Sequence, residues 1–249
     1  MSMKVQVNSI EKNFGGNAAL NKVDLEIPAG QIRAVIGPNG AGKSTLFAAI
    51  AGELKLDSGS ILFDGHDVTK MSPQRRVKQG IGRAFQVARL FPTLSVRDNI
   101  VASILSRNSK SLVFWSHRAV GDARLEANAL LEELRMERLG EITAGNLSQG
   151  DRKRLEIAMV LALQPKVLLL DEPTAGMSPE ETEATVQLIR QLWKEHNLTV
   201  LITEHDMDVV FGVAQEITVM FRGGVLCTGD PETIRAREDV AEVYLGGVS

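Results

Sequence analysis

A glycine-rich stretch, residues 37–45, has residue types and spacing that suit the binding of a phosphate chain. It fits the P-loop, or Walker A, pattern G-x-x-x-x-G-K-[ST] and consists of Gly37, Pro38, Asn39, Gly40, Ala41, Gly42, Lys43, Ser44 and Thr45. Its glycines free the backbone to turn N–H groups toward an anion, and a following helix adds a positive dipole end. In such a loop Lys43 reaches the β- and γ-phosphates of a nucleotide, and the Ser44 hydroxyl binds Mg²⁺.

The segments on either side of this loop are the ones that a P-loop requires. Residues 31–36 are short, apolar and β-branched, which predicts a buried strand, and residues 46–51 predict the start of a helix. A glycine-rich turn that only caps a helix is the alternative, and the complete strand–loop–helix setting makes it weak. A dinucleotide-binding fingerprint would need a glycine where the chain has Thr45.

Two further predicted strands end in side chains suited to metal binding and proton transfer. Residues 167–170 form a continuous apolar run, typical of a strand buried on both faces of a parallel sheet, and Asp171 and Glu172 follow it. Residues 198–203 predict another strand, followed by Glu204 and His205. Ligands of open α/β sheets bind at the carboxyl ends of the strands, so Asp171 is a candidate for Mg²⁺ and Glu172 for polarising water. On this pattern alone, His205 is equally well a structural histidine.

Two helices begin with recognisable caps. Ser148 with Asp151 three residues later resembles a capping box, and Ser178 precedes a proline and two glutamates. The cap explains Ser148 but not Gly150, because a glycine in the first turn lowers helix stability. A close approach of another group to the backbone would explain it.

The N-terminal region predicts an antiparallel β layer, with apolar residues alternating at Val5 and Val7 and again at positions 23, 25 and 27. Phe14 lies in this region beside two glycines. It is either a core or loop side chain or a ring that stacks on a nucleobase, and the residues leave both interpretations open.

Residues 81–86 predict a short strand that ends on Gln86, and residues 87–146 predict a mostly helical insert. Leu125, Ala129, Leu130 and Leu134 recur there at helical spacing. The apolar cluster at 111–115 is either core of the insert, which we favour, or a docking patch for a partner.

The composition fits a globular protein of one domain or two small ones, since 44% of its 249 residues are hydrophobic and 24% are charged. A net charge of −3 argues against nucleic acid as the main partner. The single Cys227 excludes an internal disulfide and favours a reducing cytoplasm. No apolar run reaches the roughly 18 residues of a membrane span, and the first residues lack the apolar core of a signal peptide. We expect other chains to hold the protein at any membrane that it serves.

A phosphate cradle, a strand-end aspartate and a neighbouring glutamate suffice for a nucleoside triphosphate hydrolase. The order of motifs resembles the ATP-binding cassette (ABC) family over essentially the whole chain. The motifs are residues 37–45, Gln86, residues 147–151, residues 167–172, residues 175–178 and His205. The resemblance implies an α/β fold with a P-loop NTPase (RecA-like) core, an N-terminal antiparallel β subdomain and an inserted α-helical subdomain. Residues 1–86 and 147–249 would form the core with its β subdomain, and residues 87–146 the helical signature subdomain.

The resemblance also implies roles for the motif residues, with ATP and Mg²⁺ as cofactors. It implies that Asp171 holds Mg²⁺ through water, that Gln86 senses Mg²⁺ and the γ-phosphate, and that Glu172 is the general base. It further implies that His205 contacts the γ-phosphate and that Phe14 stacks on adenine.

Residues 147–151 correspond to the family's signature segment. The resemblance implies that Ser148, Gln149 and Gly150 lie at the ATP of a second cassette, so that the active unit is a head-to-tail dimer. Asp151 stands where many members carry Gln, and Ser178 replaces a common Asp.

Three sequence segments, residues 80–86, 172–181 and 243–246, resemble those of the ATPase subunits of branched-chain amino acid importers. This resemblance implies a second ATPase subunit, two integral membrane permease subunits and, indirectly, a solute-binding protein, at the cytoplasmic face of the inner membrane. The alternatives are a urea or other polar amino acid importer, a soluble non-transport ABC ATPase, and a nucleotide-binding module without turnover.

Overall fold

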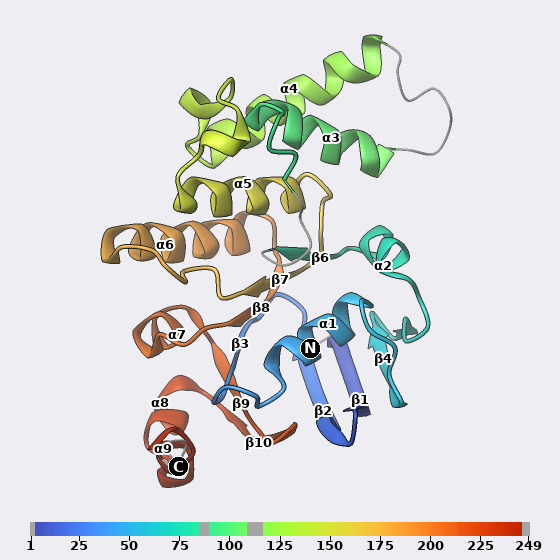
Figure 1. Cartoon of the computed structure of the whole chain (residues 1–249), viewed down its shortest axis with the longest axis vertical. Coiled ribbons are helices and arrows are strands. Elements are labelled where there is room, and N and C mark those ends of the chain that lie inside the picture. Colours follow the sequence, from blue (N-terminus) through green and yellow to red (C-terminus); the bar gives the residue numbers. More distant parts are fainter. Residues whose placement is uncertain (1–2, 85–89, 109–116, 246–249) are drawn as a thin grey trace.

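The computed structural model describes residues 3–84, 90–108 and 117–245. Figure 1 shows a helical part at the top of the view, a central region of strands and helices, and a separate N-terminal sheet toward the bottom right. Within the described ranges, no helix combines the length and apolar character that crossing a membrane demands.

The central sheet has six strands in the order β10-β9-β3-β8-β7-β6. They are β3 (Ile32–Ile36), β6 (Ile81–Ala84), β7 (Val167–Asp171), β8 (Thr199–Thr203), β9 (Glu216–Phe221) and β10 (Gly224–Gly229). Every residue of β3, β7 and β8 is buried, as expected for parallel strands covered on both faces. All pairs are parallel except β9 with β10. Strand β8 lies between β3 and β7, so the P-loop strand and the acidic strand are separated by the strand that leads to His205.

The N-terminal sheet is antiparallel, as predicted, with the order β2-β1-β4-β5. Its strands are β1 (Met3–Phe14), β2 (Asn17–Pro28), β4 (Ser58–Phe63) and β5 (His66–Asp67). Val5 and Val7 are buried, and they pack in one cluster with Phe47 and Ile50. The two last-named residues belong to α1 (Lys43–Ala51), so this sheet supports the helix that follows the P-loop.

The helical part consists of α3 (Val96–Asn108), α4 (His117–Glu133), the short 3₁₀ turns η2 (Glu137–Leu139) and η3 (Ala144–Asn146), and α5 (Gln149–Leu161). The buried face of α4 includes Ala127 and Leu130. Leu125 is 70% exposed and Ala129 is also exposed, so these two apolar residues lie off the face that the spacing suggested. The helical spacing of apolar residues in α4 gives two neighbouring stripes that could be buried. Packing against α3 determines which stripe is buried.

The remaining helices are α2 (Pro73–Gln79), α6 (Pro179–Glu195), α7 (Met207–Val213), α8 (Pro231–Arg235) and α9 (Glu238–Leu245). Ser178 caps α6 in a complete capping box with Glu181, as the sequence predicts. The cap fixes where α6 begins, directly after the loop that follows β7.

Candidate functional site

The lysine of the P-loop is almost fully buried and is held by its own loop. Lys43 is 7% exposed, and its Nζ donates to the carbonyl oxygens of Gly37 at 2.6 Å and Pro38 at 3.1 Å. Burial lowers the pKa of Lys43, and the nearby carboxylates of Glu172 and Asp171 oppose this shift. Both acidic residues at the end of β7 are therefore within electrostatic reach of the P-loop lysine.

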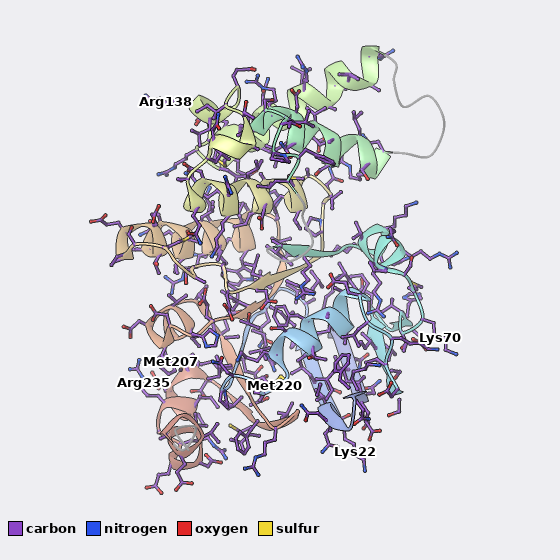
Figure 2. The ribbon with its side chains drawn as sticks, in the orientation of Figure 1. Lys22, Lys70, Arg138, Met207, Met220 and Arg235 are labelled. Atoms are coloured by element: carbon purple, nitrogen blue, oxygen red, sulfur yellow. The ribbon has the colours of Figure 1, made fainter. Side chains whose placement is uncertain are left out.

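The three P-loop glycines serve different purposes. A Cβ on Gly37 would lie 2.2 Å from the carbonyl oxygen of Met220, and one on Gly42 would lie 2.5 Å from that of Ala19. These two glycines let the loop pack against β9 and β2, and Figure 2 labels Met220 on β9. A Cβ on Gly40 would meet nothing within 4 Å, so the loop is open there. An open loop, a buried cation and the unpaired first N–H groups of α1 fit a phosphate chain.

The carboxylate of Asp171 has a defined donor on each oxygen. Thr203, the last residue of β8, donates its hydroxyl to Oδ1 at 2.6 Å, and Arg83 donates to Oδ2 at 2.8 Å. In the described part of the chain, no group of three or more His, Cys, Asp or Glu side chains could hold a metal ion. Mg²⁺ is commonly bound by one or two carboxylates together with substrate phosphates, so Asp171 beside the P-loop, with Ser44 in the first turn of α1, fits this ion.

Glu172 and His205 meet through their side chains at the same edge of the sheet. Nε2 of His205 lies 2.8 Å from Oε1 of Glu172, and both side chains are about half exposed. Glu172 has a positive φ of 52°, and its N–H donates to the carbonyl oxygen of Thr203 at 3.0 Å. A non-glycine residue in this left-handed region is strained, and such strain clusters at functional sites. A half-exposed carboxylate held by a histidine is chemically able to accept a proton from water.

Two further residues join the loop after Glu172 to its surroundings. Lys153 of α5 donates from Nζ to the carbonyl oxygens of Glu172 at 3.0 Å and Ala175 at 2.7 Å. Buried Glu204 accepts from the backbone N–H of Thr174 at 2.8 Å and from its hydroxyl at 2.7 Å. No sequence motif indicates a role for Lys153 or Glu204. A carboxylate next to His205, at the end of a buried strand, was the available signal for Glu204.

The signature segment is organised by two carboxylates of this chain. The Ser148 hydroxyl accepts from the N–H of Asp151 at 3.1 Å and donates to its Oδ2 at 2.8 Å, so the predicted cap is present. A Cβ on Gly150 would lie 2.9 Å from Oε1 of Glu181, which is the close approach that Gly150 implied. Ser148 and Gln149 are exposed. Among the described residues, no hydrogen bond joins the signature segment to the P-loop of the same chain.

The exposed ring of Phe14 ends β1, next to the turn into β2. It is 54% exposed, and Nζ of Lys12 lies 5.4 Å from the ring centroid. The close approach of Ala19 to Gly42 brings β2 beside the P-loop, so this hairpin borders the phosphate cradle. Gln86 and the apolar cluster at 111–115 lie outside the described residues.

Comparison with known proteins points to one family. The family pattern described as ABC transporter matches residues 20–175. The high-affinity branched-chain amino acid transport ATP-binding protein LivG of Escherichia coli (strain K12) is 38% identical over 250 residues, 97% of each chain. Its counterpart BraF of Pseudomonas aeruginosa is 35% identical over 248 residues, again 97% of each chain. The lipopolysaccharide export system ATP-binding protein LptB of E. coli (strain K12) is 35% identical over 238 residues, 96% of this chain and 95% of LptB.

Solved structures agree with the sequence relatives. The crystal structure of the ADP conformation of an ATP-binding cassette of an ABC transporter has a TM-score of 0.86 and 30% identity. It covers 99% of this chain and 100% of that chain. The dimeric structure of a bacterial ABC transporter cassette has a TM-score of 0.79 and 26% identity, over 91% of this chain and 98% of that one. The expected fold class is confirmed by these neighbours, whereas the division at residues 86 and 147 stays a prediction. A P-loop, a strand-end Asp–Glu pair and near-full-length relatives together show that the chain belongs to the ABC transporter family, as one of its ATP-binding cassettes.

Proposed function

We propose that this chain is the ATP-hydrolysing subunit of an importer of branched-chain amino acids. The observation that carries the proposal is the near-full-length identity to LivG and BraF, in a chain that retains a paired Glu172 and His205. A module that binds a nucleotide without hydrolysing it does not require the Glu172–His205 pair. The 35% identity to LptB means that overall identity alone does not select the cargo. The resemblance of residues 80–86, 172–181 and 243–246 to the branched-chain importer group supports that cargo.

The residues of the site divide the work of ATP hydrolysis. The P-loop N–H groups and Lys43 bind the β- and γ-phosphates, which Lys43 reaches as a compact point charge. Ser44, Asp171 and Gln86 would hold Mg²⁺, which when bound polarises the γ-phosphate as a Lewis acid. Glu172 takes a proton from the attacking water or orients it. His205 holds the Glu172 carboxylate and supplies a second polar contact at the γ-phosphate side.

A second cassette completes the site in this proposal. The sequence holds one P-loop and one signature segment, and in this proposal a second cassette supplies the signature segment that faces this P-loop. The exposure of Ser148 and Gln149 at the start of α5 supports an arrangement in which this helix N-terminus faces the partner's ATP. The existence of a dimeric cassette among the structural relatives supports the same assembly.

The membrane partners of the proposal are two integral permease subunits, and a solute-binding protein acts through them. Besides Leu125 of α4, three large apolar side chains are exposed in the described helical part: Phe91 at 50%, Ile142 at 39% and Leu94 at 38%. Their segments are joined by hydrogen bonds, from Val96 N–H to the Ile142 carbonyl oxygen and from Ala144 N–H to that of Leu94, each 2.9 Å. An apolar surface of this kind suits a permease loop. The chain would then act as a peripheral subunit at the cytoplasmic face of the inner membrane.

The solute is tested with the complete transporter. The chain is purified with its co-purifying membrane subunits, reconstituted in vesicles and assayed for ATP hydrolysis with the solute-binding protein added. Leucine, isoleucine or valine is expected to stimulate hydrolysis, whereas urea and lipopolysaccharide are not. Stimulation by urea instead, or by lipopolysaccharide, would contradict the proposed cargo while leaving the ATPase assignment intact.

The catalytic assignment is tested by Glu172→Gln, with Glu132→Gln on the exposed face of α4 as control. Glu172→Gln is expected to bind ATP, to lower turnover by roughly 10²-fold or more and to accumulate an ATP-bound dimer. Phosphate release and light scattering measure the two effects. Turnover at the wild-type rate would remove Glu172 from the chemistry. A protein that stays monomeric at high concentration, even with its membrane partners, would overturn the two-cassette site.

A further inference from the structure

A chain of three charged side chains runs behind the candidate metal site. Arg83 of β6 donates from one guanidinium nitrogen to Oδ2 of Asp171 at 2.8 Å, and its other terminal nitrogen forms an ion pair with Glu53. The side chains of Arg83 and Asp171 are 3% and 5% exposed, and that of Glu53 is 23% exposed. One buried cation therefore serves two carboxylates, of which one is the candidate ligand of Mg²⁺.

Both ends of this ion-pair chain are fixed by the backbone. Glu53 follows the C-cap of α1, and its N–H donates to the carbonyl oxygen of Ala48 at 2.9 Å, so its position depends on the helix that starts at the P-loop. Ala84 pairs with Leu170 where β6 runs beside β7, which places the Arg83 backbone next to the strand that carries Asp171. Neither carboxylate can move far from Arg83 without movement of α1, β6 or β7.

The positive charge of Arg83 affects Asp171 in two opposite ways. A buried carboxylate without a partner is costly, so Arg83 stabilises the protein when no metal ion is present. The same charge lowers the attraction of Asp171 for a second cation, because two like charges then share one carboxylate. The negative charge of Glu53 offsets part of this positive charge, because Glu53 forms an ion pair with the other end of the guanidinium.

The outer end of the ion-pair chain, at Glu53, reaches a cavity of about 310 Å³ in the described part of the molecule. Glu53 and Arg83 line it together with apolar residues, among them Val77 of α2, Met159 of α5 and Leu163. The ion-pair chain thus connects a space between the core helices and the helical part to the candidate metal site.

We propose that Arg83 is a positioning residue that sets the affinity of Asp171 for Mg²⁺, and that Glu53 tunes it by competing for the guanidinium. The inference rests on the proposed function in one respect, the binding of Mg²⁺ with nucleotide at Asp171. In the metal-free protein Arg83 neutralises Asp171. When the ion binds, the charge of Arg83 is balanced by Glu53.

The test measures the affinity of the purified full chain, saturated with ADP, for Mn²⁺ as a probe of the Mg²⁺ site, by electron paramagnetic resonance of the free ion. Arg83→Gln removes the competing cation and is expected to tighten Mn²⁺ binding about tenfold. Glu53→Gln leaves the full charge of Arg83 on Asp171 and is expected to weaken binding by roughly threefold to tenfold. The double variant should bind Mn²⁺ more tightly than the wild type, because without Arg83 the ion pair through which Glu53 weakens the competing charge is gone.

Arg33→Gln is the matched control, because Arg33 is also buried and forms an ion pair with Glu216, but near the amino end of β3. It is expected to lower stability without changing Mn²⁺ affinity. Thermal unfolding gives a second measurement. Arg83→Gln should lower Tm by roughly 5–15 °C in EDTA, and by clearly less with ADP and Mg²⁺, whereas Arg33→Gln should lower it equally in both.

The outcomes separate this inference from the proposed function. Weaker Mn²⁺ binding in Arg83→Gln, or shifts in the same direction for Arg83→Gln and Glu53→Gln, would overturn the inference while metal binding at Asp171 stands. If Arg83→Gln does not fold, Glu53→Gln still decides, because unchanged or tighter Mn²⁺ binding in that variant contradicts the proposal. If the wild-type chain binds ADP without any bound Mn²⁺, the proposed metal site itself is wrong.

Discussion

Nε2 of His205 lies 2.8 Å from Oε1 of Glu172, although the two residues are 33 positions apart in the chain. The contact exists because β7 and β8 are adjacent and in register, with Asp171 opposite Thr203. Each residue of the pair follows its strand closely, so both side chains emerge at the same edge of the sheet. The carboxylate that we propose as the base is thereby oriented by a side chain of the same chain.

Replacing His205 by alanine tests this orientation. His205→Ala is expected to lower the rate of phosphate release by roughly 10²-fold with little change in ATP affinity, because the P-loop contacts remain. His196→Ala is a matched control, since His196, at the end of α6, also contacts a glutamate, Glu133, at the end of α4. If His205→Ala and His196→Ala lower the rate of phosphate release equally, the contact of His205 with Glu172 has no special role.

The buried P-loop lysine predicts a pH dependence of nucleotide binding. Burial lowers the pKa of Lys43 from its ordinary value of 10.5, so the ammonium loses its proton at a lower pH than an exposed lysine does. ATP affinity is therefore expected to fall as pH rises through the lowered pKa, and binding should take up protons in that range. Calorimetry in buffers of different ionisation enthalpy measures the uptake, and Lys43→Ala should abolish both tight binding and the pH dependence.

The lowered pKa of Lys43 also affects stability, but in the opposite direction: ATP affinity falls as pH rises, whereas the free energy of unfolding rises. Between the lowered pKa and 10.5 the unfolded chain holds a proton on Lys43 that the folded chain has lost, so the free energy of unfolding of the nucleotide-free protein rises with pH there. Lys43→Ala should lack this contribution. An identical pH slope in both proteins over that range would contradict the lowered pKa.

The carboxylate in the signature segment predicts a stronger dimer when its charge is removed. Asp151→Asn keeps the backbone N–H that Ser148 caps but removes a negative charge where the partner's phosphate is expected. In a Glu172→Gln background, ATP-dependent dimerisation should tighten about two- to fivefold, the size of a solvent-screened charge interaction. Asp98→Asn is the control, because Ser95 and Asp98 make the same local contacts at the start of α3. If the Glu172→Gln protein and its Asp151→Asn and Asp98→Asn derivatives all dimerise with equal affinity, Asp151 lies away from the partner's nucleotide.

The P-loop glycines predict unequal losses of stability. Gly37→Ala would force a Cβ to within 2.2 Å of a backbone oxygen of Met220, so β9 or the loop must shift. We expect it to lower the free energy of unfolding by about 3 kcal/mol or more. Gly40→Ala has open space and meets only the strain of a positive φ, about 1–2 kcal/mol. Urea denaturation of the nucleotide-free proteins compares them, and equal values would contradict the close packing at Gly37.

Features that depend on short spacings were predictable. The P-loop, the caps at Ser148 and Ser178, the buried strand before Asp171 and the alternating N-terminal strands each depend on residues that are near one another in the sequence, so local rules suffice to predict them. A helical insert with helical spacing from Leu125 to Leu134 was also predictable, but not which face of the helix there is buried. Leu125 is exposed because tertiary packing, not helix periodicity, selects between adjacent stripes.

Features that join distant residues were not predictable. Arg83 and Asp171 are 88 positions apart, and Thr174 and Glu204 are 30 apart. Arg83 stands inside a short buried strand, and nothing in the sequence spacing identified Asp171 or Glu53 as its partner.

The sequence by itself determined which chemistry this protein can perform, because the residue types that bind phosphate, metal and water stand in short motifs with local rules. The tertiary structure alone decided how those groups are charged and oriented. Strand order places β8 between β3 and β7, and parallel register sets Asp171 beside Thr203. Only after the sheet has formed do a buried arginine and a strand-end histidine face the two carboxylates, since side-chain direction on a strand depends on pairing with segments far away in the chain.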